Sequence, residues 1–360
     1  MKYVDEFRDG RLIKKEAAFI RAFVDRKWRF MEVCGTHTMS IFRFGLRQIL
    51  PYDIELLSGP GCPVCVTPNG YLDKAIAIAG EKNVIVTTFG DMLRVPGSDS
   101  TLEKAKAGGC DIRTVYSTTD ALEIAGKNPA KEVVFLGVGF ETTAPTVAQS
   151  VIIAKRLKIT NYSVLSAHKT MPEALGSLAA SGANVDGFIL PGHVSAITGT
   201  APYRPLAKIY KKRCVVSGFE PLDILQSIAM LIRQKSPKVE IQYKRIASGG
   251  GNPKARASIY KVFEKCGSVW RGIGKVADSG LKIKKSCRDF DAEVKFHPKV
   301  RPPKENAACR CGDVLKGLIS PTECALFARA CTPEHPVGAC MVSGEGACAA
   351  YYKYRGRIHG

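Results

Sequence analysis

The 360-residue sequence lacks the features that mark secreted and membrane proteins. No stretch approaches the roughly 18 consecutive apolar residues that a membrane-spanning helix requires. The start MKYVDEFRDGRLIKK has no apolar core of the kind found in secretory signals. We therefore expect a cytoplasmic protein that makes no contact with a membrane, in which structural disulfide bonds are disfavoured.

Signatures of nucleotide and nucleic-acid binding are also missing. The glycine-rich stretch Ser248–Asn252 lacks the GxxxxGK[ST] arrangement of a phosphate-binding loop, so its glycines are predicted to serve a turn. No RGG run, zinc-finger spacing or RNA-binding aromatic motif accompanies the net charge of +20. Between Arg204 and Arg310 there are 25 Lys/Arg and 9 Asp/Glu. We expect this basic block to be a solvated surface or to bind acidic partner proteins, rather than nucleic acid.

Cysteine is the residue that the sequence has in unusual number, with 13 in total. Six of them fall in the last 52 residues, and four of these fit one spacing: Cys309-x14-Cys324-x6-Cys331-x16-Cys348. Four thiolates can hold an iron–sulfur cubane, and a bound metal would supply folding energy that this Gly- and Pro-rich tail lacks. Cys311 or Cys340 can replace a member of the set, so the choice of four among six stays open.

Three other interpretations of the cysteines also stay open. Structural zinc sites usually show paired C-x2-C knuckles, and none occurs after residue 300. Disulfide bonds suit secreted proteins, for which the sequence has no signal. Free buried thiols are the expected state of Cys110, Cys214, Cys266 and Cys287.

Short apolar runs alternate with helical stretches between about residues 28 and 235. This alternation is typical of parallel sheets that are covered on both faces. The predicted strands are WRFMEV (28–33), IELL (54–57), NVIVTTF (83–89), IRTVYS (112–117), EVVFLGV (132–138), YSVLSA (162–167), GFILP (187–191) and CVVSG (214–218). The predicted helices are Ser40–Leu50, Gly70–Gly80, Thr101–Ala107, Ala144–Leu157, Pro172–Ser181 and Pro221–Gln234.

The polar stretch GKNPAK (126–131) is predicted to divide this region. We expect an α/β fold with two doubly wound parallel-sheet domains, over residues 1–127 and 128–235. A basic, cysteine-rich domain that holds the cluster is expected over residues 236–360. No sequence repeat relates the two halves.

Polar or thiol-bearing loops follow five of the predicted strands. In open α/β sheets, ligands gather outside the carboxyl ends of the strands. The five loops are CGTHT (34–38), GPGCPVCVTP (59–68), GFETT (139–143), SAHK (166–169) and PGHVSAITG (191–199). We expect them to converge on one cleft or on two facing clefts.

Two of these loops carry cysteines. Cys62 and Cys65 form a C-x2-C pair, a spacing that suits reversible dithiol/disulfide chemistry better than a lone zinc knuckle. A helix that begins near residues 67–68 would favour a thiolate there. Cys34 and His37 suit a transition-metal site or a histidine-activated thiol. The plain alternative for them is a buried small residue beside a helix cap.

Other loops carry candidate acid–base groups. Glu141 and Thr142 lie just before a predicted helix, where the acid suits a general base or an orienting partner. A threonine at this place also suits a helix N-cap. His193 follows a strand among other polar loops and is a candidate for the same site. Further candidates are His168, Lys169 and Asp91.

In this order, CGTHT, GPGCPVCVTP, GFETT, PGHVSAITG and the terminal cysteine spacing resemble the HypD family of hydrogenase maturation proteins, over essentially the whole chain. The resemblance implies a monomeric scaffold with two α/β domains and a third domain that carries a [4Fe-4S] cluster. It implies a HypC-type chaperone and a HypE-type protein with a thiocyanate group on its C-terminal cysteine as partners. In this family an Fe(CN)2CO unit is assembled on the HypC–HypD complex and passed to the precursor of the [NiFe]-hydrogenase large subunit.

The resemblance also implies roles for individual residues. Cys34 would be this chain's ligand to the iron that carries cyanide and carbon monoxide, with Cys62 and Cys65 as the redox pair near it. The side chains that line the cleft would be His37, Glu141, Thr142 and His193. The cluster ligands would be Cys309, Cys324, Cys331 and Cys348. The family's first motif often has a second histidine where this chain has Thr38, so no role for a side-chain nitrogen is implied there.

These expectations describe a redox-active maturation scaffold rather than an enzyme with its own small-molecule product. One alternative is a stand-alone thiol–disulfide reductase fed by an iron–sulfur cluster, which would act on a small dithiol without a partner. Another is an iron–sulfur or zinc protein that binds nucleic acid through the basic block, with a steep salt dependence.

Overall fold

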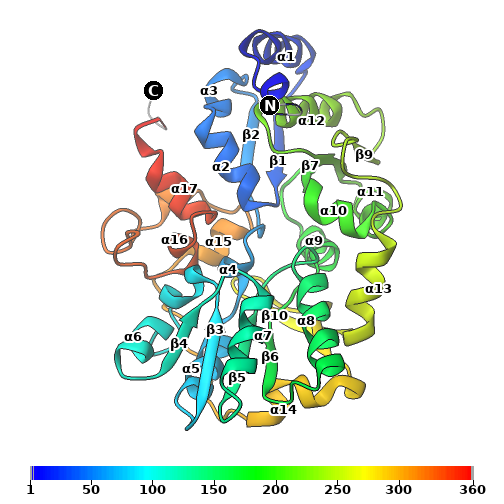
Figure 1. The fold of residues 1–360 in the computed structure, drawn as a ribbon. Coiled ribbons are helices and arrows are strands. Elements are labelled where there is room, and N and C mark those ends of the chain that lie inside the picture. Colours follow the sequence, from blue (N-terminus) through cyan, green and yellow to red (C-terminus); the bar gives the residue numbers. More distant parts are fainter. Residues whose placement is uncertain (1, 3, 358–360) are drawn as a thin grey trace.

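The computed structural model describes residue 2 and residues 4–357. Its β structure consists of two parallel sheets and one antiparallel hairpin (Figure 1). The first sheet has the order β2-β1-β7-β8-β9, with bounds β1 Trp28–Glu32, β2 Ile54–Ser58, β7 Gly187–Pro191, β8 Arg213–Ser217 and β9 Val239–Ile241. The second sheet has the order β4-β3-β5-β6, with bounds β3 Val84–Thr88, β4 Asp111–Thr114, β5 Glu132–Gly137 and β6 Tyr162–Ser166. The hairpin pairs β10 Phe263–Trp270 with β11 Gly274–Ile283.

The predicted α/β class with two parallel sheets is confirmed, and all eight predicted strands are present. The path of the chain differs from the predicted division at residue 127. The chain forms β1 and β2, then the whole second sheet, and then returns to the first sheet for β7 to β9. The stretch 126–131 lies between α7 (Thr118–Lys127) and β5, and β3 pairs with both β4 and β5. It is therefore an internal connection of the second sheet.

Helices cover both faces of the first sheet. Successive side chains of a strand point to opposite faces, so each strand contributes apolar residues to two layers of packing. Phe30, Ile189 and Val215 pack with helix residues of α1 and α12 on one face. Phe188 and Val216 pack with residues of α9 and α11 on the other. The helices around this sheet are α1 Gly10–Phe23, α2 Gly35–Arg43, α3 Leu46–Ile49, α9 Met171–Ala180, α10 Gly192–Thr198, α11 Arg204–Lys208 and α12 Pro221–Arg233.

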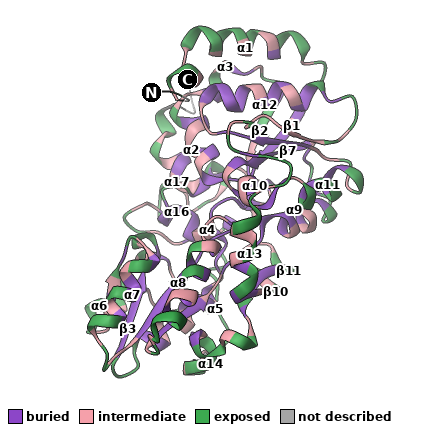
Figure 2. Ribbon diagram, turned by 45° about the vertical axis from the view of Figure 1, so that its right-hand side comes forward, coloured by how far each residue is buried: buried purple, intermediate pink, exposed green. Residues whose placement is uncertain are grey.

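The second sheet is covered in the same way. Val133 and Phe135 pack toward α7 and α8, whereas Val134 and Leu136 pack toward α5. Strands β3, β5 and β6 are almost entirely buried, as Figure 2 shows for β3, whereas the edge strand β4 is partly exposed. The helices of this half, besides α7, are α4 Pro63–Val66, α5 Asn69–Ala79, α6 Leu102–Ala107 and α8 Ala144–Leu157.

Residues after 236 are distributed over both sheets. Strand β9 extends the first sheet, whereas Ile259, Phe263 and Leu281 join the core of the second. Helix α16 packs against α4 and helix α17 against α2, which places the cysteine-rich tail between the sheets (Figure 1). The remaining helices are α13 Pro253–Val262, α14 Ala292–Phe296, α15 Cys311–Leu315, α16 Ala339–Val342 and α17 Ala347–Lys353. Among the described residues, no helix combines the length and apolar character needed to cross a bilayer.

Candidate functional site

Cys34 lies at the junction between β1 and α2, where it is the N-cap residue of the helix. The side chain is 3% exposed, and its Sγ lies 4.0 Å from Nε2 of His193. Burial raises the pKa of the Cys34 thiol to about 12, and the negative charge of Glu345 adds to the shift. Cys34 is therefore a protonated thiol at neutral pH until a ligand replaces the proton.

His37 and His193 lie on either side of Phe219, with ring centroids 4.6 and 5.1 Å from that ring. Burial lowers the pKa of both imidazoles to about 4, so both are neutral. The His37 Nε2 atom lies 2.9 Å from the carbonyl oxygen of Gly218. Because a carbonyl only accepts, Nε2 carries the hydrogen, and the buried Nδ1 keeps a lone pair without a partner. The structure thus brings Cys34, His37 and His193 together, as predicted.

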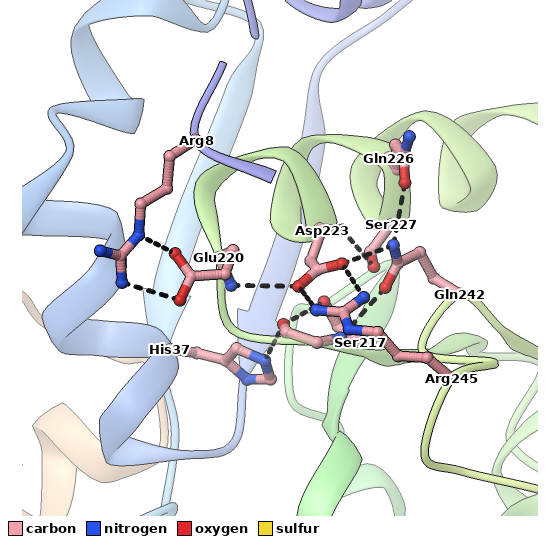
Figure 3. Close-up of polar contacts among 10 residues, drawn as sticks. Arg8, His37, Ser217, Glu220, Asp223, Gln226, Ser227, Gln242 and Arg245 are labelled. Atoms are coloured by element: carbon pink, nitrogen blue, oxygen red, sulfur yellow. Dashed lines mark hydrogen bonds and ion pairs between the residues drawn. The ribbon is translucent and has the colours of Figure 1, made fainter. Parts of the chain in front are cut away.

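A buried polar network fixes the turn that carries Gly218 and Phe219 (Figure 3). Gln242 accepts a hydrogen bond from Gly218 N–H at 3.1 Å and donates to Asp223 at 2.8 Å. Arg245 donates to both carboxylate oxygens of Asp223, which is fully buried. Removing either partner of such a buried ion pair would leave an uncompensated charge and would destabilise the fold strongly. The Arg245–Asp223 pair therefore holds the turn in place. This network could not be anticipated from the sequence, because Asp223, Gln242 and Arg245 belong to none of the recognised motifs.

Glu32 is a residue of the site that sequence reasoning missed. It lies in β1, 1% exposed, two residues before Cys34. Its carboxyl group accepts hydrogen bonds from the Thr38 hydroxyl at 2.5 Å and from Cys34 N–H at 3.3 Å. Burial raises the pKa of Glu32 to about 8 in spite of these bonds. The only sign in the sequence that Glu32 belongs to the site was an acidic residue inside the apolar stretch WRFMEV.

Replacing Glu32 by glutamine is expected to flatten the pH dependence of stability. The folded-state pKa of about 8 is above the ordinary value of 4.5, so unfolding releases a proton between these values. Rising pH therefore destabilises the wild type relative to Glu32→Gln, by at most about 1.4 kcal/mol per pH unit. Urea unfolding of both proteins from about pH 5 to pH 8 measures the difference. Parallel pH profiles would show that Glu32 is not buried as a neutral acid.

The C-x2-C loop lies directly beside Cys34. The Gly35 N–H donates to the Gly61 carbonyl at 3.3 Å, and a Cβ atom on Gly61 would lie 2.2 Å from the Cys34 nitrogen. Only glycine permits this approach. Cys62 is the N-cap of the single-turn helix α4, and its sulfur accepts a hydrogen bond from Cys65 N–H at 3.3 Å. Burial raises the pKa of Cys65 well above its ordinary value, so the thiolate expected there does not form: desolvation outweighs one helical turn.

All six C-terminal cysteines line one cavity. Its other walls are mainly apolar, from Val314, Leu326, Phe327 and Met341. The cysteines that line it are Cys309, Cys311, Cys324, Cys331, Cys340 and Cys348. We call this cavity the six-cysteine pocket. All thirteen cysteines carry free thiols, and those expected to be plain buried thiols are not among its lining residues.

A chain of sulfur contacts joins the six-cysteine pocket to the C-x2-C loop. The Sγ atoms of Cys311 and Cys340 lie 2.8 Å apart. The Cys340 thiol also contacts that of Cys65, and Cys65 Sγ lies 3.9 Å from the carbonyl of the preceding Ala339. Cys309 in turn contacts Cys311. Thiols that are far apart in the sequence, such as Cys65 and Cys340, are thus neighbours in space.

Glu141 and Thr142 are placed apart from Cys34. Glu141 accepts a hydrogen bond from Met171 N–H at 3.0 Å and lines a cavity between α9, α10 and α13. Burial raises its pKa to about 8. Thr143, rather than Thr142, is the N-cap residue of α8, and its hydroxyl donates to Phe140 O at 3.2 Å. A catalytic role for Glu141 or Thr142 at Cys34 stays a prediction that this placement does not support.

The remaining candidates have structural contacts. Lys169 is 2% exposed and donates to Ser268 Oγ at 2.8 Å and Val269 O at 2.6 Å, which fastens the β10–β11 hairpin to the second sheet. His168 packs against Phe263 of the same hairpin. Asp91 accepts a hydrogen bond from the Ser343 hydroxyl at 3.1 Å.

The glycine-rich stretch 248–252 forms the predicted turn. It packs against the end of α10, where Thr200 N–H donates to Gly249 O at 3.1 Å and Asn252 N–H donates to Ile197 O at 3.0 Å. Gly251 has a φ of +66°, a conformation that side chains disfavour.

Comparison with known proteins shows the family to which the chain belongs. A family described as "HypD: Hydrogenase formation hypA family" matches residues 11–355. The hydrogenase maturation factor HypD of Cupriavidus necator is 46% identical, over 98% of this chain and 97% of its own length. The hydrogenase expression/formation protein HupD of Azotobacter chroococcum is 47% identical over the same shares. HypD of Escherichia coli K12 is 44% identical, over 99% of this chain and 98% of its own. The chain therefore belongs to the HypD family of hydrogenase maturation factors.

Proposed function

We propose that this protein is the redox-active scaffold on which an iron ion receives cyanide and carbon monoxide before delivery to the hydrogenase large subunit. Its partners in this reaction are a HypC-type chaperone and a HypE-type cyanide donor. One observation carries the proposal: the buried thiol of Cys34 lies beside a dithiol, and sulfur contacts link that dithiol to the six-cysteine pocket.

Cys34 supplies one ligand for the iron cargo. A soft thiolate suits iron that carries cyanide and carbon monoxide. Within residue 2 and residues 4–357, no three His, Cys, Asp or Glu side chains stand together in a way that could hold one metal ion. The other ligands must therefore come from a partner protein and from the diatomic groups. Because Cys34 binds its proton tightly, iron binding there releases a proton, for which the neutral His193 is the nearest acceptor.

The six-cysteine pocket fits a [4Fe-4S] cluster. The sulfurs surround an apolar cavity rather than one point, as a polynuclear cluster requires. We assign the cluster to Cys309, Cys324, Cys331 and Cys348, the set that the family resemblance implies. The sulfurs of Cys311 and Cys340, which lie 2.8 Å apart, then remain as a separate dithiol. When bound, the cluster supplies single electrons at low potential.

The cysteines outside the cluster carry the electrons toward Cys34 by thiol–disulfide exchange. Cys340, whose buried thiol must first lose its proton, attacks Cys65 in a Cys62–Cys65 disulfide and forms a mixed disulfide, which Cys311 then resolves. The products are a Cys311–Cys340 disulfide and a reduced Cys62/Cys65 dithiol, so two electrons have moved. That dithiol can cleave the carrier's thiocyanate: the S–C bond breaks, cyanide and the carrier thiol leave, and Cys62 and Cys65 become a disulfide again.

Hydrogenase activity in an Escherichia coli strain without its own HypD tests this function. We expect the wild-type chain to restore activity and Cys34→Ala to restore none. Cys214→Ala, which alters a fully buried cysteine in β8, is the matched control and should retain most activity. Full restoration by Cys34→Ala would contradict the assignment. Turnover of a small dithiol without any partner would favour the stand-alone reductase instead.

A further inference from the structure

A second cavity, of about 390 Å³, opens beside the six-cysteine pocket. Loop residues 96–98, 304–306 and 336–338 form its walls. Cys309, Cys311 and Gly338 line both cavities. These three residues therefore form the wall between the second cavity and the six-cysteine pocket. We call this cavity the entry pocket.

The rim of the entry pocket is basic. Residues 299–308 form an irregular and exposed segment that carries Lys299, Arg301 and Lys304 against one acid, Glu305. Within the part of the chain that the structure describes, none of these three cations has an ion-pair partner within 4.0 Å. The basic residues on either side of this segment do have ion-pair partners, since Lys295 pairs with Glu132 and Arg310 pairs with Asp313. Of the three cations, Lys304 lines the entry pocket, together with Arg271 and the acid Glu305. Arg301 and Lys304 also line a neighbouring cavity, to which Asp73 and Asp99 contribute.

Buried polar groups hold this rim in place. Asn69, 4% exposed, donates to Lys304 O at 2.6 Å, and Lys304 N–H donates to Ser98 Oγ at 2.9 Å. Asn69 is one of the residues that line the entry pocket, and its buried Oδ1 atom has no hydrogen-bond partner. Arg271, 7% exposed, donates to Thr67 O at 2.8 Å and places a fixed positive charge next to Cys309. These contacts hold a positively charged surface in a fixed position next to the six-cysteine pocket, where it can attract an acidic partner.

We propose that the entry pocket is the docking site of an acidic one-electron carrier protein that reduces the metal group of the six-cysteine pocket. This inference rests on the proposed function. The unpaired cations attract an acidic surface, accelerate its encounter and orient it. One electron leaves the carrier, which is oxidised, and enters the iron–sulfur group, which is reduced; no covalent bond forms or breaks. In this proposal, the acidic carrier protein is the partner of the basic block between Arg204 and Arg310.

The test reverses the three unpaired charges together, as Lys299→Glu, Arg301→Glu and Lys304→Glu in the full chain. A plant-type [2Fe-2S] ferredoxin, which is acidic, serves as the probe. We expect its dissociation constant, measured in about 50 mM salt, to rise by about tenfold or more, and its electron-transfer rate to fall similarly. Reduction by dithionite, a small inorganic reductant, should keep its rate.

The matched control makes the same charge change elsewhere, as Arg204→Glu, Lys208→Glu and Lys211→Glu, all of which are exposed. This control should bind ferredoxin almost as the wild type does. Equal affinity of the rim variant and the wild type, or equal losses in both variants, would overturn the docking site. A wild type that binds ferredoxin but holds no iron–sulfur group would instead refute the proposed function and leave the docking measurement readable.

Discussion

Replacing Cys324 by alanine is expected to remove most iron and acid-labile sulfide from the anaerobically purified protein, by about tenfold or more. The thiolates of the six-cysteine pocket are the cluster's only protein ligands in our assignment, and three of them hold a cubane poorly. We also expect the tail to depend on the bound group for folding, because its helices α15, α16 and α17 have only five, four and seven residues. We therefore also expect faster proteolysis of residues after 300. Iron and sulfide analysis with a visible spectrum measures the loss.

The control for this variant is Cys287→Ala, which changes a half-buried cysteine outside the six-cysteine pocket. It should retain the full iron and sulfide content. Retention of the cluster in Cys324→Ala, together with its loss in Cys311→Ala or Cys340→Ala, would contradict our choice of four ligands. A colourless wild type that contains zinc would refute the cluster altogether.

Replacing Cys34 by alanine is expected to abolish binding of the iron that lies outside the cluster. Cys65 contacts Cys340 on the side of the six-cysteine pocket, so we do not expect its thiol to replace Cys34 as a ligand. In the wild type, binding should weaken about tenfold for each pH unit of acidification near neutrality, because one proton competes with the metal at a thiol whose pKa is about 12. Any iron that still binds to Cys34→Ala should bind without this pH dependence.

Metal analysis after gel filtration, on the protein in complex with its HypC-type partner, measures this iron. Cys214→Ala is again the control, because its thiol is buried in β8 and has no place in the site. Iron content of Cys34→Ala equal to that of the wild type, or a pH-independent wild type, would show that Cys34 is not a ligand.

The strands could be predicted because their apolar runs are buried on both faces and therefore read as strands without tertiary knowledge. The pairing of β1 with β7 could not, because 159 residues separate Cys34 from His193 and no local signal encodes that neighbourhood. The polar stretch 126–131 resembled a domain boundary because connections within a sheet are also polar. The order of the strands in the sheets distinguishes a domain boundary from a connection within one sheet. Local sequence does not reveal that order.

The site was predictable where chemistry lies at a strand end. Cys34 and His193 were found in this way, because they follow β1 and β7, which are adjacent and parallel. Glu141 was misplaced by the same rule, because it follows a strand of the other sheet. Glu32 and Asp223 act from inside a strand and a helix, where a single acid carries no recognisable pattern. The contact between Cys65 and Cys340 depends on the packing of α16 against α4, which spacing cannot reveal.

Infrared spectroscopy of the protein, purified anaerobically with its HypC-type and HypE-type partners, tests the central claim most directly. Metal-bound cyanide and carbon monoxide absorb in a region where protein groups do not, so the cargo is seen without a chromophore. We predict cyanide and carbonyl bands for the wild type and for Cys214→Ala, and none for Cys34→Ala. Unchanged bands in Cys34→Ala, or a wild type that is loaded with iron but has no such bands, would contradict the account.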